Sequence, residues 1–298
     1  MSSHQVLRLR RGFDLGYDEV GDPAGQAVIA FHGTPGSRLQ VAQQISDQPA
    51  RDAGVRLIAI DRPGYGASSF QPNRRLTDVA LDVAELADHL ELEQFTVVGI
   101  SGGGPHALAC GALLGDRVRR LAIVSGLGPA RQKSSTRQMM ATNRLLFALA
   151  RRRTWLARPV AAAMATTLRR APVPTLKAML RQMPPRDVAV LSTPEILAAF
   201  ADDARQSPRT LGRAIAQDVG LFTREWGFSL DAIRVPVDLF HGDADVNVPP
   251  HHVDVLAAGL PQATVHRYPG EGHLLVVDRL GEIIAAVTAP PPETPTRQ

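Results

Sequence analysis

The chain has 298 residues, of which 44% are hydrophobic and 21% charged, with 25 glycines and 23 prolines. These values are typical of a soluble globular protein, and they exclude a collagen-like, low-complexity or mainly disordered chain. A chain of this length can bury one large core, or one core that carries a long insertion.

The charge is unevenly distributed along the sequence. The whole chain has 33 Lys and Arg against 29 Asp and Glu, a net charge of +4. Residues 127–228 hold 17 of the basic and 6 of the acidic residues, so this region carries +11 and the remainder −7. A basic chain suggests nucleic acid as a partner, but only 5% of the residues are aromatic and no basic run is interleaved with aromatics. We therefore expect no nucleic-acid binding.

The sequence offers few groups that would bind a metal or a cofactor. Cys110 is the single cysteine, which excludes an intramolecular disulfide and a zinc site built on paired cysteines. We therefore expect no metal and no cofactor. Residues 1–11 contain charged side chains but no apolar segment, and no run of about 18 apolar residues occurs. These features predict a cytoplasmic protein without stable membrane insertion, and they leave the oligomeric state open.

Predicted strands and helices alternate along most of the chain. Strands are expected at residues 5–10, 13–20, 26–31, 55–60, 95–100, 118–124, 235–241 and 263–268. Helices are expected at residues 38–53, after an N-cap at Thr77, at 106–114, after Pro249-Pro250 and at 274–287. Continuous apolar runs such as 26–31 are typical of strands covered on both faces. The alternation predicts right-handed βαβ units, and hence an α/β fold whose mostly parallel sheet has helices on both faces.

The basic region breaks this alternation because it is predicted to contain helices alone. Thr193-Pro194 and Ser207-Pro208 each combine an N-cap residue with a first-position proline, a signal that begins a helix. We interpret the region as a helical cap over an α/β core. The predicted organisation is listed in chain order: core 1–126, cap 127–228, core 229–289 and a disordered tail 290–298.

The strongest functional motif is the pentapeptide from Gly99 to Gly103, which contains Ser101. It follows a predicted buried strand and precedes a helix, the context that a nucleophile elbow requires. A nucleophile on so tight a turn has strained backbone angles, and its neighbours must be small. The following helix also directs N–H groups at an oxyanion. We therefore predict that Ser101 is a catalytic nucleophile.

A serine nucleophile needs a base, and the base needs a group that orients it. His273 lies in a glycine-rich loop between the last strand and the last helix, where an imidazole could reach the serine. Asp243 and Asp245 both follow the strand at 235–241. We prefer Asp245 as the orienting residue, because Asp243 directly follows Gly242 and is typical of a turn residue that bonds its own backbone. Surface or strand positions are expected for His4, His89, His251, His252 and His266.

The oxyanion hole requires two backbone N–H donors. One is expected from Gly102, the residue after the nucleophile, and the second from the loop after the strand at 26–31, where we choose Thr34. His32, in the same loop, is interpreted as a structural residue that forms hydrogen bonds.

Several of these motifs occur in a fixed order that resembles the α/β-hydrolase superfamily, in its serine-nucleophile branch with a helical cap. The resemblance covers about residues 5–287 and rests on three further features: the HGTPG turn at 32–36, the DRPGYGAS segment at 61–68 and the late cap. It implies an eight-stranded sheet with the cap inserted after the sixth strand. It also implies that the DRPGYGAS segment is a structural turn beside the site, without a catalytic role.

The resemblance and the triad together predict a serine hydrolase that acts on a small or medium-sized, largely apolar ester, thioester or lactone. Related haloalkane dehalogenases and epoxide hydrolases use an aspartate nucleophile, whereas position 101 is serine. The alternatives are perhydrolase or non-hydrolytic chemistry at the same triad, amide hydrolysis as in proline iminopeptidases, and a ligand-binding module. Met139, Met140, Trp155 and Trp226 are the expected substrate-binding residues of the cap. Arg151, Arg152 and Arg153 are interpreted as a solvated helix end.

Overall fold

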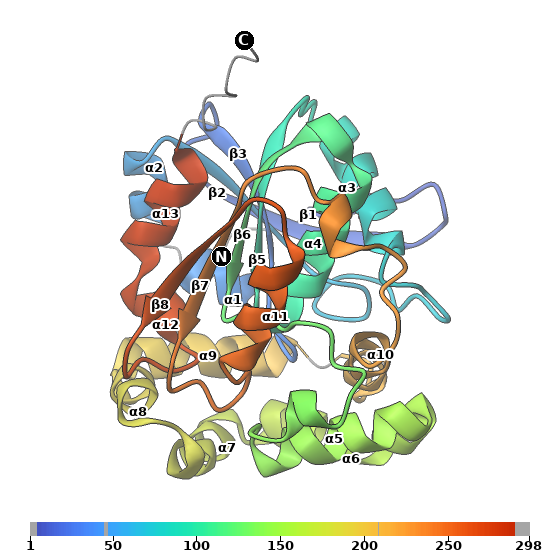
Figure 1. Ribbon diagram of the computed structural model, residues 1–298, viewed down its shortest axis with the longest axis vertical. Helices are drawn as coiled ribbons and strands as arrows, with labels where there is room; N and C mark the ends of the chain where they lie inside the picture. Colours follow the sequence, from blue (N-terminus) through green and yellow to red (C-terminus); the bar gives the residue numbers. More distant parts are fainter. Residues whose placement is uncertain (1–4, 45–46, 208, 290–298) are drawn as a thin grey trace.

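The computed structural model describes residues 5–44, 47–207 and 209–289, and its centre is one eight-stranded sheet (Figure 1). The strand order is β1-β2-β4-β3-β5-β6-β7-β8. Strand β2 runs antiparallel to both of its neighbours, and all pairs from β4 to β8 are parallel. The strands are β1 (Gln5–Arg8), β2 (Asp14–Gly21), β3 (Gln26–Phe31), β4 (Val55–Ile60), β5 (Phe95–Ile100), β6 (Val118–Val124), β7 (Val237–Gly242) and β8 (Ala263–Tyr268). The predicted mostly parallel sheet is confirmed.

Helices cover both faces of this sheet, because its central strands are apolar on both sides. Every residue of β5 is buried, as its continuous apolar sequence predicts. One face packs against α3 (Asp78–His89), α4 (Gly104–Leu113) and α11 (His251–Gly259). The other packs against α1 (Arg38–Gln44), α2 (Asp47–Asp52), α12 (Leu275–Asp278) and α13 (Leu280–Thr288).

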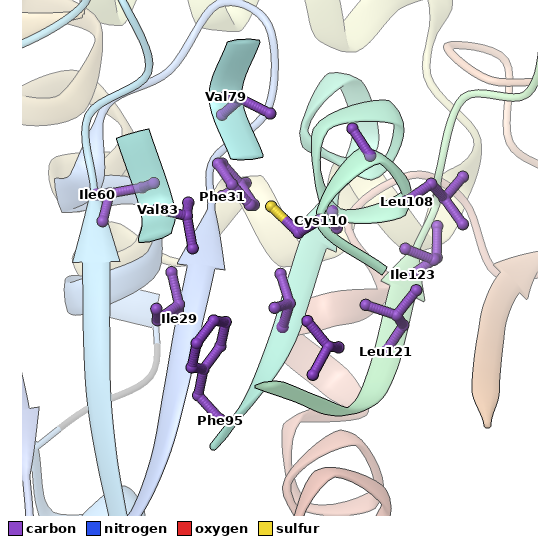
Figure 2. Close-up of a cluster of buried hydrophobic side chains, with 14 of the residues drawn as sticks. Ile29, Phe31, Ile60, Val79, Val83, Phe95, Leu108, Cys110, Leu121 and Ile123 are labelled. Atoms are coloured by element: carbon purple, nitrogen blue, oxygen red, sulfur yellow. The ribbon is translucent and has the colours of Figure 1, made fainter. Parts of the chain in front are cut away.

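The core on the α3 and α4 side is tightly packed. Figure 2 shows Ile29 and Phe95 from the sheet lying close to Val83 of α3 and Cys110 of α4. All four side chains are buried. Burial raises the pKa of the Cys110 thiol, so it packs here as a neutral apolar group.

A layer of six helices connects β6 to β7 and lies across one end of the sheet, at the bottom of Figure 1. We call α5 to α10 the helical layer. Its helices are α5 (Ala141–Arg152), α6 (Arg158–Arg170), α7 (Pro172–Met179), α8 (Pro185–Ser192), α9 (Pro194–Gln206) and α10 (Arg213–Phe222). No helix within the described ranges is long and apolar enough to cross a membrane.

Several local predictions need correction. The helix expected at 38–53 is formed as two helices, α1 and α2, and the helix expected at 274–287 is formed as α12 and α13. Thr77 precedes α3 but its side chain makes no capping bond, and the Asp78 carboxylate accepts the N–H of Arg75 instead. Ser207 is the C-cap of α9, Pro208 and the tail 290–298 lie outside the described residues, and α10 begins at Arg213 after Gly212. Gly212 has φ +77°, and a Cβ there would lie 2.4 Å from the backbone of α6.

Candidate active site

Ser101 occupies a sharp turn between β5 and α4. It begins a short 3-10 helix, η1 (Ser101–Gly103), with a φ of +53°, a left-handed conformation that is strained for a residue with a side chain. A Cβ at Gly99 would lie 2.8 Å from Ala107 Cβ, and one at Gly103 would lie 2.5 Å from the Phe31 carbonyl oxygen. Glycine at these positions therefore lets the turn pack against α4 and β3 while Ser101 stays at the end of the sheet.

The structure brings the three predicted triad residues together. Nε2 of His273 lies 3.0 Å from Oγ of Ser101, and its Nδ1 lies 2.7 Å from Oδ2 of Asp245. Oδ1 of Asp245 accepts the N–H groups of Asn247 and Val248, both at 2.8 Å. The Asp245 side chain is fully buried, so its loop holds it in one orientation toward the imidazole.

The charges around His273 favour a protonated imidazole. Burial lowers the pKa of His273, but the carboxylates of Asp245 and Asp187 outweigh it, so this pKa lies above its usual value. The imidazole is thus suited to hold a proton taken from Ser101.

Other predicted candidates lie away from the triad. Asp243 forms an exposed ion pair with Arg267 rather than a bond to its own backbone, and it does not contact His273. His252 is not at the surface as expected: it is buried on α11, and its Nε2 lies 2.8 Å from the Ser135 carbonyl oxygen. His32 has the structural role expected of it, since its Nε2 accepts the N–H of Arg62 at 3.0 Å.

Two backbone N–H groups lie close to Ser101. Gly102 is in the first turn of a helix, where N–H groups have no intrahelical acceptor. Among the described residues, no acceptor bonds the N–H of Thr34. Thr34 packs directly on Gly102, because a Cβ at Gly102 would lie 2.3 Å from Thr34 Oγ1. The structure therefore places both predicted oxyanion donors side by side.

A buried group of charges holds Thr34, and no local sequence pattern indicates it. Arg62, from the DRPGYGAS segment, donates hydrogen bonds to Thr34 Oγ1 at 2.6 Å and to the Gly33 carbonyl at 2.7 Å. Arg62 and Arg74 both form buried ion pairs with Asp218 of α10. Asp218 also accepts a hydrogen bond from Thr34 Oγ1 at 3.2 Å. Arg62 contacts no reacting group, so it is a positioning residue, and its partner lies 156 positions away.

Replacing Gly102 by alanine should damage the oxyanion hole. The new Cβ would meet Thr34, which Arg62 and Asp218 hold in place, so a donor must shift. We expect the kcat for p-nitrophenyl butyrate to fall by about 10²-fold, the usual effect of losing one donor. Gly281→Ala is the matched control, because no atom lies within 4 Å of its added Cβ. Full activity in the Gly102→Ala enzyme would contradict the proposed hole.

A second positioning group comes from α8. The Asp187 carboxylate accepts the backbone N–H of His273 at 2.9 Å and that of Leu274 at 3.0 Å. Asp187 is 1% exposed, and burial raises its pKa although the two N–H groups oppose this shift. No local pattern marked this residue, because its partners lie 86 and 87 positions further along the chain. The helical layer thus holds the loop that carries the candidate base.

Asp187→Asn is expected to lower kcat by about 10 to 10²-fold, because one N–H of the His273 loop would face an amide NH₂ and the imidazole would move. Loss of the Asp187 charge should also move the acid limb of the kcat/KM profile to lower pH, since that charge raises the pKa of His273. Glu195→Gln, at an exposed position of α9, is the control. A lower Tm with an unmoved pH profile would mean that Asp187 is only structural.

The triad opens onto a cavity of about 480 Å³ under the helical layer. Its lining is mainly apolar and includes Met139 and Met140, as predicted. The same prediction is wrong for both tryptophans. Trp155 is 60% exposed, and Trp226 packs with Phe228 in the core beside the sheet. None of the described residues that line the cavity is an arginine.

The three arginines at the end of α5 lie away from the cavity. Arg151 donates a hydrogen bond to Thr136 Oγ1, and Arg152 and Arg153 are exposed. Arg152 and Arg153 therefore agree with a solvated helix end, whereas Arg151 is half-buried and the prediction is wrong for it.

The chain is similar to known proteins in both sequence and fold. A family model described as alpha/beta hydrolase fold matches residues 26–280. Epoxide hydrolase B of Mycobacterium tuberculosis is 38% identical over 104 residues, which are 34% of this chain and 28% of that protein. The chain spans about a third of the length of the curated relatives that it matches.

Solved structures share the same architecture over nearly the whole chain. An esterase from Exiguobacterium antarcticum has a TM-score of 0.70 at 19% identity, covering 95% of this chain and 97% of that chain. The enol-lactonase from Burkholderia xenovorans LB400 has a TM-score of 0.69 at 17% identity, covering 95% and 98%. These likenesses concern the fold alone. Because the family model covers most of its length, the chain belongs to the α/β-hydrolase fold family.

Proposed function

We propose that the protein is a serine hydrolase that cleaves a small or medium-sized, largely apolar ester, thioester or lactone through an acyl-enzyme on Ser101. One observation carries this proposal. Ser101, His273 and Asp245 form a continuous hydrogen-bonded series beside two backbone N–H groups and at the base of an apolar cavity. In this proposal the helical layer is the cap that encloses the substrate.

Acylation begins when Ser101 Oγ attacks the carbonyl carbon of the substrate. His273 Nε2 takes the hydroxyl proton as the C–O bond forms, and Asp245 stabilises the imidazolium and holds its tautomer. The carbonyl oxygen becomes an oxyanion that accepts hydrogen bonds from the N–H groups of Thr34 and Gly102. Collapse of this intermediate breaks the bond to the leaving alcohol or thiol, which receives the proton from His273.

Deacylation repeats these steps with water as the nucleophile. His273 takes a proton from water, and the hydroxide oxygen attacks the acyl carbon. The second oxyanion uses the same two donors. Its collapse releases the carboxylic acid, and the proton returns to Ser101. Every proton in the cycle is transferred by groups of the chain, the substrate or water.

The cavity supports an apolar substrate of limited size. Its volume of about 480 Å³ is within the range of small-molecule sites. Methionine side chains such as Met139, Met140 and Met164 contribute to the lining, and their flexible thioethers adapt to varied apolar groups.

An acyl-enzyme can be sought directly. The enzyme is mixed with p-nitrophenyl butyrate, quenched in acid and digested. The mass of the peptide that contains Ser101 is then measured by mass spectrometry. We expect a burst of p-nitrophenol and a butyryl group on that peptide. Release of p-nitrophenol without butyryl-Ser101 would contradict the mechanism. Added hydrogen peroxide separates perhydrolysis, which would yield a peracid.

A further inference from the structure

The apolar cavity contains a polar region on α9. Asp203 and Ser207 are four residues apart, so they lie on one side of this helix and its C-terminal end. Both line the cavity, although only 4% of Asp203 and 1% of Ser207 is exposed. We call these two residues the α9 pair.

The two side chains differ in how their hydrogen bonds are satisfied. Oδ1 of Asp203 accepts the N–H of Ser37 at 2.7 Å and the Ser37 hydroxyl at 2.5 Å. Oγ of Ser207 is buried and has no hydrogen-bond partner among the described residues. A buried hydroxyl without a partner is unfavourable, so a group that bonds it would be held there.

The α9 pair is connected to the triad through one loop. Asp203 bonds Ser37, and Gln40, three residues further on, lines the same cavity. Oε1 of Gln40 accepts the N–H of Gly33 at 2.6 Å. A Cβ at Gly33 would lie 3.3 Å from Ser101 Cβ and 3.2 Å from Gln40 Oε1. A substrate at Ser101 therefore has polar groups of this loop and of α9 along its path in the cavity.

We infer that the α9 pair binds a hydroxyl group of the substrate, so that the preferred substrates are hydroxyl-bearing esters or lactones. This inference rests on the proposed function. A hydroxyl is a small neutral group whose single oxygen can donate a hydrogen bond to the Asp203 carboxyl group and accept one from Ser207. It would satisfy the unpartnered Ser207 oxygen and add one bond to Asp203.

An ammonium group fits this region less well. Moving a full charge into an apolar cavity carries a large desolvation penalty. Burial raises the pKa of Asp203 to about 7, so near neutral pH this group is only partly ionised and compensates a cation incompletely.

The inference can be tested by binding to the Ser101→Ala protein, which separates recognition from turnover. Methyl hexanoate and a series of methyl hydroxyhexanoates, with the hydroxyl on each chain carbon in turn, are titrated by calorimetry. At least one hydroxy ester should bind about tenfold more tightly than methyl hexanoate. Adding Ser207→Ala, or Asp203→Asn, should reduce this preference to about twofold or less. Adding Asp202→Asn, an exposed neighbour of Asp203, should leave it intact.

Each other outcome has a definite meaning. The inference is wrong if no hydroxy ester is preferred, or if the preference survives both Ser207→Ala and Asp203→Asn. Tighter binding of a matched amino ester would mean that the α9 pair binds an ammonium group and not a hydroxyl, which would overturn the inference. If Asp203→Asn fails to fold because Ser37 loses its acceptor, Ser207→Ala decides. If the wild type hydrolyses no ester while the binding preference holds, the proposed function fails and the subsite stands.

Discussion

Replacement of Ser101 by alanine is expected to lower kcat for p-nitrophenyl butyrate by about 10⁴ to 10⁶-fold. No other nucleophile lies within hydrogen-bond distance of His273 Nε2 in the described chain. Alanine keeps the Cβ and the strained φ of +53°, so the turn should survive and the loss should come from chemistry alone. Steady-state release of p-nitrophenol measures the effect.

Two controls make this result interpretable. Ser192→Ala, at an exposed position at the end of α8, should retain wild-type kcat. The Ser101→Ala protein should keep the wild-type circular dichroism spectrum and Tm, because it loses one hydroxyl and no packing. An undiminished rate in folded Ser101→Ala protein would remove Ser101 from the mechanism.

Asp245→Asn should lower kcat by about 10⁴-fold. The N–H groups of Asn247 and Val248 would keep the amide oxygen at the Oδ1 position, so the amide NH₂ would face His273 Nδ1. The imidazole would then carry its proton on Nε2 and could not accept one from Ser101. Residual hydrolysis at several pH values measures the loss.

The direction in which the pH profile of kcat/KM moves is an independent test of the role of Asp245. In the wild type, kcat/KM should fall as the pH drops through the raised pKa of His273, because the protonated imidazole cannot act as a base. Asp245→Asn removes a charge that raises this pKa, so the acid limb should move to lower pH. Asp243→Asn, in the same loop but paired with Arg267, should change neither kcat nor the profile. The reverse pattern in the two variants would assign the orienting role to Asp243.

The elements predicted most accurately are those whose formation depends on residues adjacent in the sequence. The segments 26–31, 55–60, 95–100, 118–124 and 263–268 are strands with the predicted bounds, because the residues that favour a strand are adjacent in each segment. The triad positions could also be predicted from the sequence, since the carboxyl ends of parallel strands meet at one edge of the sheet. Ser101, Asp245 and His273 each follow such an end, and the structure brings them together.

The sequence could not show which partner a buried side chain takes from a distant segment. Arg62 and Asp218, or His273 and Asp187, are joined only when the helical layer packs on the sheet. The prediction that Trp155 and Trp226 bind substrate is wrong for a related reason. Their size predicts burial, but Trp155 lies on the outside of the layer, and Trp226 belongs to the core cluster between the sheet and helices α3, α4 and α11, so neither lines the cavity.

Three carboxylates of the helical layer limit which parts of that layer can change without loss of the triad geometry. Asp187, Asp203 and Asp218 come from α8, α9 and α10; Asp187 accepts hydrogen bonds from the His273 loop, and Asp203 and Asp218 accept them from the loop that contains Thr34 and Ser37. A foreign cap grafted between β6 and β7 would have to reproduce all three acceptors, or the His273 and Thr34 loops would lose their positions. Helices α5 to α7 supply none of these bonds, although Phe147 of α5 and Met164 of α6 line the cavity. Substrate range can therefore change by substitution in that half of the layer while the geometry of hydrolysis is inherited intact.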